Sequence, residues 1–125
     1  MKESIRIRDL SSEHSTAEKC FIVELSNSDD DEALSIARAR VGPGTTTRWH
    51  RLRKSGERYY ILSGNGRVEV GNMSPADVRP GDVVIIPPMC RQRIANTGTE
   101  DLVFLALCTP PFAADDYEDI DESPS

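Results

Sequence analysis

The sequence is short of cysteine, and that shortage narrows its class. Only three of its 125 residues are cysteines, Cys20, Cys90 and Cys108, and no two of them form a C-x-x-C pair. Neither a disulfide framework nor a zinc knuckle is indicated. We therefore expect buried free thiols.

Long apolar runs are also missing. No stretch approaches the ~18 consecutive apolar residues that a membrane helix needs. The segment 1–10 is charged and lacks the apolar centre of a signal peptide. We therefore expect a protein without a membrane segment, located in the cytoplasm.

An excess of positive charge is absent too. The net charge is −6, and six acidic residues lie after Ala114 without any Lys or Arg among them. The remaining chain carries 15 residues of each sign, and such a neutral body argues against a nucleic-acid partner. We predict an acidic C-terminal tail over 113–125 that is mobile unless Tyr117 or Ile120 docks it on the domain.

Several catalytic signatures do not occur. The sequence contains no GxxxxGK phosphate-binding loop, no GxSxG nucleophile elbow and no HExxH zinc motif. No helix-turn-helix segment is attached either, which disfavours the ligand-sensing half of a regulator.

A series of short β-strand patterns is what the sequence does contain. Runs rich in β-branched and aromatic residues recur at roughly 8–12-residue spacing, separated by turn signals such as Gly64-Asn65-Gly66. The length indicates one domain, with a lead-in over 1–19 and a barrel over 20–112. Over 33–41 we prefer a strand to a short helix. The series of short strands as a whole predicts an all-β sandwich or barrel.

Alternate residues of a barrel strand point toward its interior. We expect a strand over 45–52. By this rule Arg48 and His50 share one face of it, Glu57 and Tyr59 share the corresponding face of the next strand, and Gln92 lies on a later strand. An imidazole, a carboxylate and an amide can therefore converge on one point inside the barrel.

The spacing of these residues resembles that of the cupin superfamily. Its first motif runs Gly, five residues, His, one, His, three or four, Glu, six, Gly. In this sequence the residues that match the motif are Gly44, His50, Glu57 and Gly64. Leu52 stands at the position of the second His.

The second cupin motif runs Gly, five residues, Pro, one, Gly, two, His, three, Asn. Gly81, Pro87 and Asn96 match it, whereas Met89 and Gln92 stand at the second Gly and the His positions. The resemblance implies a double-stranded β-helix, or jelly-roll barrel, with six to eight strands. It also implies a homodimer, with the N-terminal segment as a candidate for strand exchange.

The resemblance maps the family's metal shell onto His50, Glu57 and Gln92. Such a set can bind a divalent Mn, Fe, Ni or Zn ion. Two of the family's three metal-binding histidines are replaced, so the set is not the two-His-one-carboxylate triad of iron oxygenases. Lewis-acid chemistry on a carbonyl or an enolate stays open.

Each of these residues also has a purely structural interpretation. Glu57 could pair with Arg48 inside the barrel or with Arg58 outside it, and Gln92 could satisfy a backbone group. Arg48 suits an anionic ligand, with Tyr59 orienting it, but Arg48 could equally be a solvated edge charge and Tyr59 a packing residue.

Two functions follow from this set of residues. The first is a metal-assisted isomerase, epimerase, lyase or oxygenase acting on a small oxygenated, anionic molecule, with its catalytic residues unassigned. The alternative is a metal-free, non-catalytic barrel that binds a sugar or an organic acid.

Overall fold

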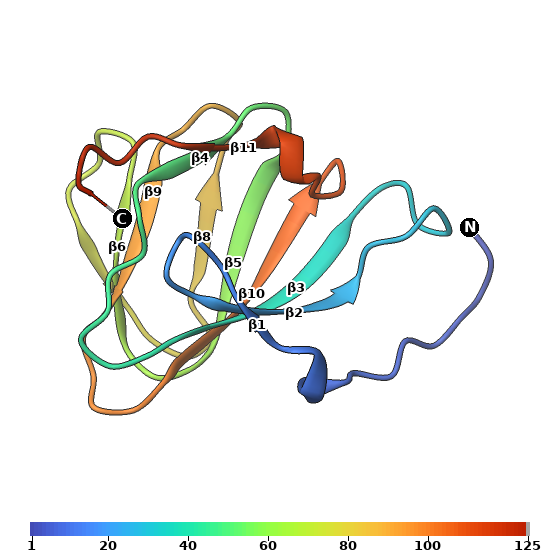
Figure 1. Ribbon diagram of the computed structural model, residues 1–125, viewed down its shortest axis with the longest axis horizontal. Coiled ribbons are helices and arrows are strands. Elements are labelled where there is room, and N and C mark those ends of the chain that lie inside the picture. The colour runs from blue at the N-terminus through green and yellow to red at the C-terminus, as the bar shows by residue number, and fades with distance from the viewer. Residues whose placement is uncertain (125) are drawn as a thin grey trace.

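The structure is a computed structural model that describes residues 1–124, and it consists of two β-sheets that face each other (Figure 1). The larger sheet has the strand order β1-β2-β3-β10-β5-β8. Its strands are β1 (His14–Ser15), β2 (Phe21–Ser26), β3 (Ser35–Val41), β5 (Gly56–Ser63), β8 (Val83–Ile86) and β10 (Leu102–Thr109). All neighbouring strands in this sheet are antiparallel.

The smaller sheet has the order β11-β4-β9-β6-β7. Its strands are β4 (His50–Leu52), β6 (Gly66–Val70), β7 (Ala76–Val78), β9 (Gln92–Asn96) and β11 (Tyr117–Asp119). Two short 3-10 helices, η1 (Leu10–Ser12) and η2 (Ala114–Asp116), complete the elements within residues 1–124. The all-β prediction is confirmed.

The inward-facing residues of the strands build the core. Along β5 the buried side chains of Glu57, Tyr59 and Ile61 alternate with more exposed ones, as expected for a sheet with one face on the core. Ile61 packs with fully buried residues of both sheets, including Ile94 and Leu102. The interior is therefore apolar at this level, and its polar residues lie on the strand ends beyond it.

The predicted strand over 33–41 is confirmed, because β3 pairs with β2 on one side and with β10 on the other. The prediction over 45–52 is only partly right. Regular pairing in that stretch begins at His50, and the residues before it make one isolated bridge, between Thr46 and Ala95. The pleated alternation therefore does not extend back to Arg48.

The hairpin predicted at Gly64-Asn65-Gly66 connects β5 to β6. Gly64 has a φ of +84°, and a Cβ built there would lie 2.5 Å from the carbonyl oxygen of Asp101. Both the left-handed backbone and the close approach require glycine.

Of the two alternatives for the acidic tail, mobile or docked on the domain, the structure shows the docked one. Its residues 117–119 form β11, which pairs with β4. The buried carboxylate of Asp116 accepts hydrogen bonds from the backbone N–H groups of Lys54 (2.7 Å) and Ser55 (3.1 Å). The tail is thus attached to the barrel through residue 124, whereas Ser125 lies outside the described residues.

No helix within residues 1–124 is long and apolar enough to cross a membrane.

Candidate functional site

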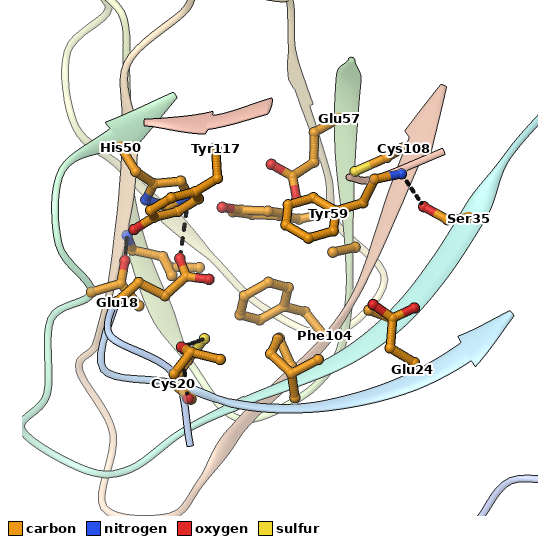
Figure 2. A pocket seen from close by; sticks show the side chains of 18 of the residues that line it. Glu18, Cys20, Glu24, Ser35, His50, Glu57, Tyr59, Phe104, Cys108 and Tyr117 are labelled. Atoms are coloured by element: carbon orange, nitrogen blue, oxygen red, sulfur yellow. Dashed lines mark hydrogen bonds and ion pairs between the residues drawn. The ribbon is translucent and has the colours of Figure 1, made fainter. Parts of the chain in front are cut away.

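A cavity of about 300 Å³ lies inside the barrel. Its polar lining residues include His50 from β4, Glu57 and Tyr59 from β5, Glu18 from the lead-in and Tyr117 from β11 (Figure 2). Its apolar wall includes Phe104, Ala39, Ala106 and Ile94. The volume is at the lower end of the range of small-molecule pockets.

His50 has a defined tautomer. Its Nδ1 lies 2.7 Å from the backbone carbonyl oxygen of Arg48, which can only accept, so Nδ1 carries the hydrogen. The other ring nitrogen, Nε2, lies 3.3 Å from Oε2 of Glu18.

Tyr117 covers the imidazole of His50. The two rings are stacked, with centroids 5.3 Å apart and planes inclined by 23°. Figure 2 shows Tyr117 lying against His50, with the Glu18 carboxylate below both. The hydroxyl of Tyr117 is buried and has no hydrogen-bond partner among residues 1–124. The tail strand therefore contributes a wall of the cavity and an unpaired polar atom.

Glu57 is a buried carboxyl group with an unsatisfied acceptor. Its Oε1 receives no hydrogen bond from the part of the chain that the structure describes. Burial raises the pKa of Glu57 to about 7, and the nearby His50 opposes that rise. The carboxyl group is therefore partly protonated near neutral pH, which is unusual for a glutamate.

Tyr59 and Gln92 form a buried hydrogen-bonded pair. The Tyr59 hydroxyl donates to Oε1 of Gln92, and burial raises the pKa of Tyr59 well above its ordinary value, so the hydroxyl stays protonated. Nε2 of Gln92 makes no hydrogen bond of normal geometry within residues 1–124, although it lies near enough to Glu57 to lower the pKa of that group. Gln92 is also directly opposite His50 across the β4–β9 pair.

Arg48 is not part of the cavity lining. Its Nε donates to Oδ2 of Asp119 at 2.7 Å, and its guanidinium also reaches backbone carbonyl oxygens of the tail, such as that of Ser123 at 2.9 Å. Arg58 donates to Oγ1 of Thr109, so neither arginine is paired with Glu57. The ligand-binding role expected of Arg48 does not fit this position, because Arg48 precedes β4 and its guanidinium is occupied by the tail.

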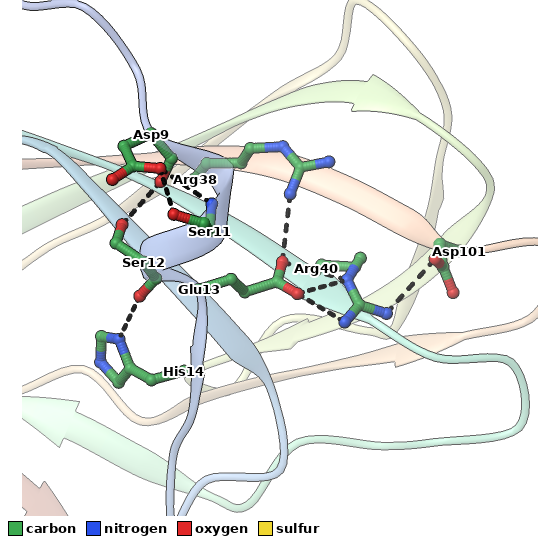
Figure 3. Close-up of polar contacts among 8 residues, drawn as sticks. All are labelled: Asp9, Ser11, Ser12, Glu13, His14, Arg38, Arg40 and Asp101. Carbon is green, nitrogen blue, oxygen red and sulfur yellow. Dashed lines mark hydrogen bonds and ion pairs between the residues drawn. The ribbon is translucent and has the colours of Figure 1, made fainter.

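Glu18 is a site residue that the sequence did not reveal. It lies in the irregular segment between β1 and β2, which has no apolar period from which a face could be predicted. The segment before it is fixed by Glu13, which pairs with Arg40 at 2.6 Å and with Arg38 at 3.2 Å (Figure 3). These ion pairs hold the lead-in against β3 and so help to position Glu18 beside His50.

The arrangement of donors does not fit a divalent metal ion. Nε2 of His50 faces Glu18, and the amide oxygen of Gln92 already accepts from Tyr59. Leu52, at the second His position of the cupin motif, is part of the buried interior. Residues 1–124 contain no group of three His, Cys, Asp or Glu side chains that could hold a metal.

Comparison with known proteins agrees with the barrel and its motifs. The family model described as "Cupin domain" matches residues 37–108, more than half of the chain. This chain belongs to the cupin family.

The predicted fold is confirmed, because solved cupins superpose on it. An oxalate decarboxylase of Lactobacillus farciminis superposes with a TM-score of 0.74 at 24% identity, covering 87% of this chain and 33% of the other. Pac13 of Streptomyces, a nucleoside dehydratase, superposes with a TM-score of 0.75 at 16% identity, covering 98% of this cupin and 100% of Pac13.

Several relatives are similar in sequence, and three of them are described below. An uncharacterised protein of Methanocaldococcus jannaschii is 37% identical over 67% of this cupin and 66% of its own length. A glucose-6-phosphate isomerase of Thermococcus onnurineus is 32% identical over 82% of this cupin and 59% of its own length. An oxalate-binding protein of Thermotoga maritima is 35% identical over 62% and 63%. The chain thus spans less than two thirds of the length of these relatives.

Proposed function

We propose that this cupin binds a small oxygenated organic molecule in the barrel cavity and moves a proton to or from it. The reaction class would be an isomerisation, an epimerisation or an elimination. The observation that carries the proposal is the presence of an imidazole with a fixed tautomer and a buried carboxyl group in the lining of one cavity. Relatives named as isomerases support the same reaction class.

The residues would divide the work according to their surroundings. Nε2 of His50 is the ring nitrogen that faces away from the backbone, so it is the atom able to take or give a proton. Glu57 would act as the second acid or base, and a pKa of about 7 suits either role near neutral pH. Tyr59 would hold Gln92, and through it the neighbourhood of Glu57, in place.

The test begins with a panel of hydroxy and keto compounds, screened by chemical-shift changes of the amides that line the cavity. For each compound that binds there, deuterium incorporation from D₂O is followed in wild type, His50→Gln and Glu57→Gln. We expect both variants still to bind the compound, but to incorporate deuterium into it at least ~100-fold more slowly than wild type.

Glu118→Gln is the matched control. It removes one negative charge from β11, but its side chain pairs with Arg51 rather than lining the cavity. If His50→Gln and Glu57→Gln incorporate deuterium into the bound compound at the wild-type rate, the proton-transfer role is refuted.

A non-catalytic, metal-free binding barrel is the second candidate. The pairing of His50 with Glu18 and its stacking on Tyr117 favour it, because both contacts restrict the imidazole. Stoichiometric binding of a compound in the cavity, without any exchange of its protons, would select this candidate.

The metal ion that the cupin resemblance implied stays a prediction, and no step of the proposed reaction depends on it. If His50, Glu57 and Gln92 did hold a metal, it would act as a Lewis acid on a carbonyl or an enolate. Elemental analysis of tag-free protein after incubation with Mn, Fe, Ni or Zn ions decides this. From the donor arrangement we expect well below one ion per chain.

The homodimer also stays a prediction. Light scattering coupled to size-exclusion chromatography measures it directly.

A further inference from the structure

We propose that the cavity takes a ligand that presents hydrogen-bond donors, either hydroxyl or ammonium groups, and that carries no negative charge. This inference rests on the proposed function, since it names the class of molecule that the same cavity would bind. It departs from an expectation of the sequence, in which Arg48 suited an anionic ligand.

The charge of the lining is the first argument. The titratable side chains that face the cavity include three glutamates, Glu18, Glu24 and Glu57, and two histidines, His14 and His50. Neither Lys nor Arg is among the lining residues that the structure describes. A carboxylate or phosphate in this space would lie near the carboxylates of Glu18 and Glu24, without a guanidinium or ammonium group in the lining to compensate its charge, which is unfavourable.

The unpaired atoms of the lining are the second argument. Oε1 of Glu57 is a buried acceptor without a partner in residues 1–124, and an orphaned buried acceptor is costly. A ligand hydroxyl or ammonium group can donate to it, whereas a ligand carboxylate can only accept. The Tyr117 hydroxyl, also unpaired, can accept a second donor of the ligand. The unpaired donor Nε2 of Gln92 does not change this balance, because Gln92 is not a lining residue.

The position of Arg48 is the third argument. It is the arginine nearest in sequence to His50 on the N-terminal side of β4, but its guanidinium is bound to Asp119 and to backbone carbonyls of the tail. The side chain of Asp121 is also fixed in this region, where it accepts from the backbone N–H of Trp49 at 2.9 Å. The tail therefore holds the positive charge of Arg48 outside the cavity.

The relatives make the inference specific to this chain. The Thermotoga relative is named for oxalate, a dianion. The Thermococcus relative is named for a sugar phosphate. The lining described above predicts that this cupin discriminates against both kinds of molecule.

The experiment uses one scaffold in three charge states. Glucosamine, glucose and glucuronate are titrated into the full-length, ¹⁵N-labelled protein, and the amides of Tyr59, Phe104 and Ala106 report on the cavity. Oxalate and glucose 6-phosphate are added as further anions. We expect saturable shifts with glucosamine and glucose, and affinities at least about tenfold weaker for every anion.

A charge-removing variant tests the cause. Glu18→Gln is expected to lower the ratio of the two dissociation constants, that of glucuronate over that of glucose, by about tenfold. Glu118→Gln, which removes one negative charge outside the cavity, is expected to leave this ratio of dissociation constants unchanged.

Three outcomes separate this inference from the proposed function. If an anion binds the cavity as tightly as glucose or glucosamine, the ligand class is wrong while small-molecule binding stands. If none of the five probes shifts the cavity amides, the inference is overturned, whereas the proposed function fails only if the panel of hydroxy and keto compounds also leaves these amides unshifted. If the neutral or cationic probes bind but Glu18→Gln and Glu118→Gln behave alike, the carboxylates do not select the ligand and the inference is overturned.

Discussion

Glu57 and Glu18 present carboxyl groups to the same cavity, but they reach it from different kinds of structure. Glu57 lies in β5, a strand paired with β10 and β8, where the pleat fixes which side chains face inward. Glu18 lies in an irregular segment five residues after Glu13, whose ion pairs with Arg38 and Arg40 hold the lead-in against β3. The barrel thus supplies a rigid half of the site, and the two chain ends supply a half that depends on a few polar contacts.

The same contrast holds for charge. The barrel strands place uncompensated polar atoms inside, such as Oε1 of Glu57. The C-terminal tail, in contrast, pairs its own charges with arginines, as Asp119 does with Arg48 and Glu118 with Arg51. The half of the site built by the barrel is therefore ready for a ligand, while the polar groups of the tail mostly serve its attachment.

The largest effect should come from the barrel itself. Ile94→Ala removes a fully buried side chain at the centre of β9 and is expected to lower the free energy of unfolding by about 2–5 kcal/mol. Urea unfolding measures it. Ile85→Ala, on the exposed face of β8, is the control, with an expected change of less than ~0.5 kcal/mol. Equal effects at both positions would contradict the assignment of the core.

A second effect concerns the pH dependence of stability. The pKa of Glu57 is raised from 4.5 to about 7 on folding, so between these values the folded state keeps a proton that the unfolded state has lost. Stability should therefore fall as pH rises through this window, by about 3 kcal/mol, and then level off above about pH 7.

Unfolding of wild type and Glu57→Gln at pH 5 and pH 8 tests this. The variant should lose most of the pH dependence, whereas Glu118→Gln should retain it. An unchanged slope in Glu57→Gln would show that Glu57 is not the group responsible.

A smaller effect is expected at the main anchor of the tail. Asp116→Ala leaves the buried backbone N–H of Ser55 without its acceptor and should cost about 1–3 kcal/mol. Asp115→Ala, one residue earlier and exposed, serves as the control in the same unfolding experiment. If both variants unfold alike, the tail contributes less to the domain than its contacts indicate.

The smallest effect should be local. Arg48→Gln removes the contacts to Asp119 and to the tail carbonyls, so the amide of Ile120, which donates to Trp49, should exchange with solvent faster. The amides of β5 should keep their protection. Hydrogen exchange followed by NMR distinguishes this from global loosening, in which both groups would accelerate together.

Much of the barrel could be predicted from the sequence because strand periodicity is local. The turn at Gly64, the inward face of β5 and the extended conformation of β3 all depend on short-range patterns of apolar, polar and glycine residues. The sequence does not predict strand β7 (Ala76–Val78), because its three residues carry no such pattern.

The site could be predicted only where its residues lie in regular strands. Tyr59 and Glu57 follow the alternation of β5, and His50 is the first residue of β4. Arg48 precedes that strand by two residues, so the alternation rule does not apply to it and its guanidinium points to the tail instead. For Tyr117 the sequence indicated only that it could dock the tail on the domain, and not that it would stack on His50.

The sequence by itself determined the family, the barrel and the inward positions of the strand residues, because the spacing of glycines and the two-residue period act over a few residues. The tertiary structure alone decided that Glu18 and Tyr117 join His50 and that Asp119 holds Arg48 away from the cavity. These contacts join segments that are far apart in the chain, through side chains in segments without a period. Their outcome depends on how the two ends pack across the barrel rather than on any local pattern.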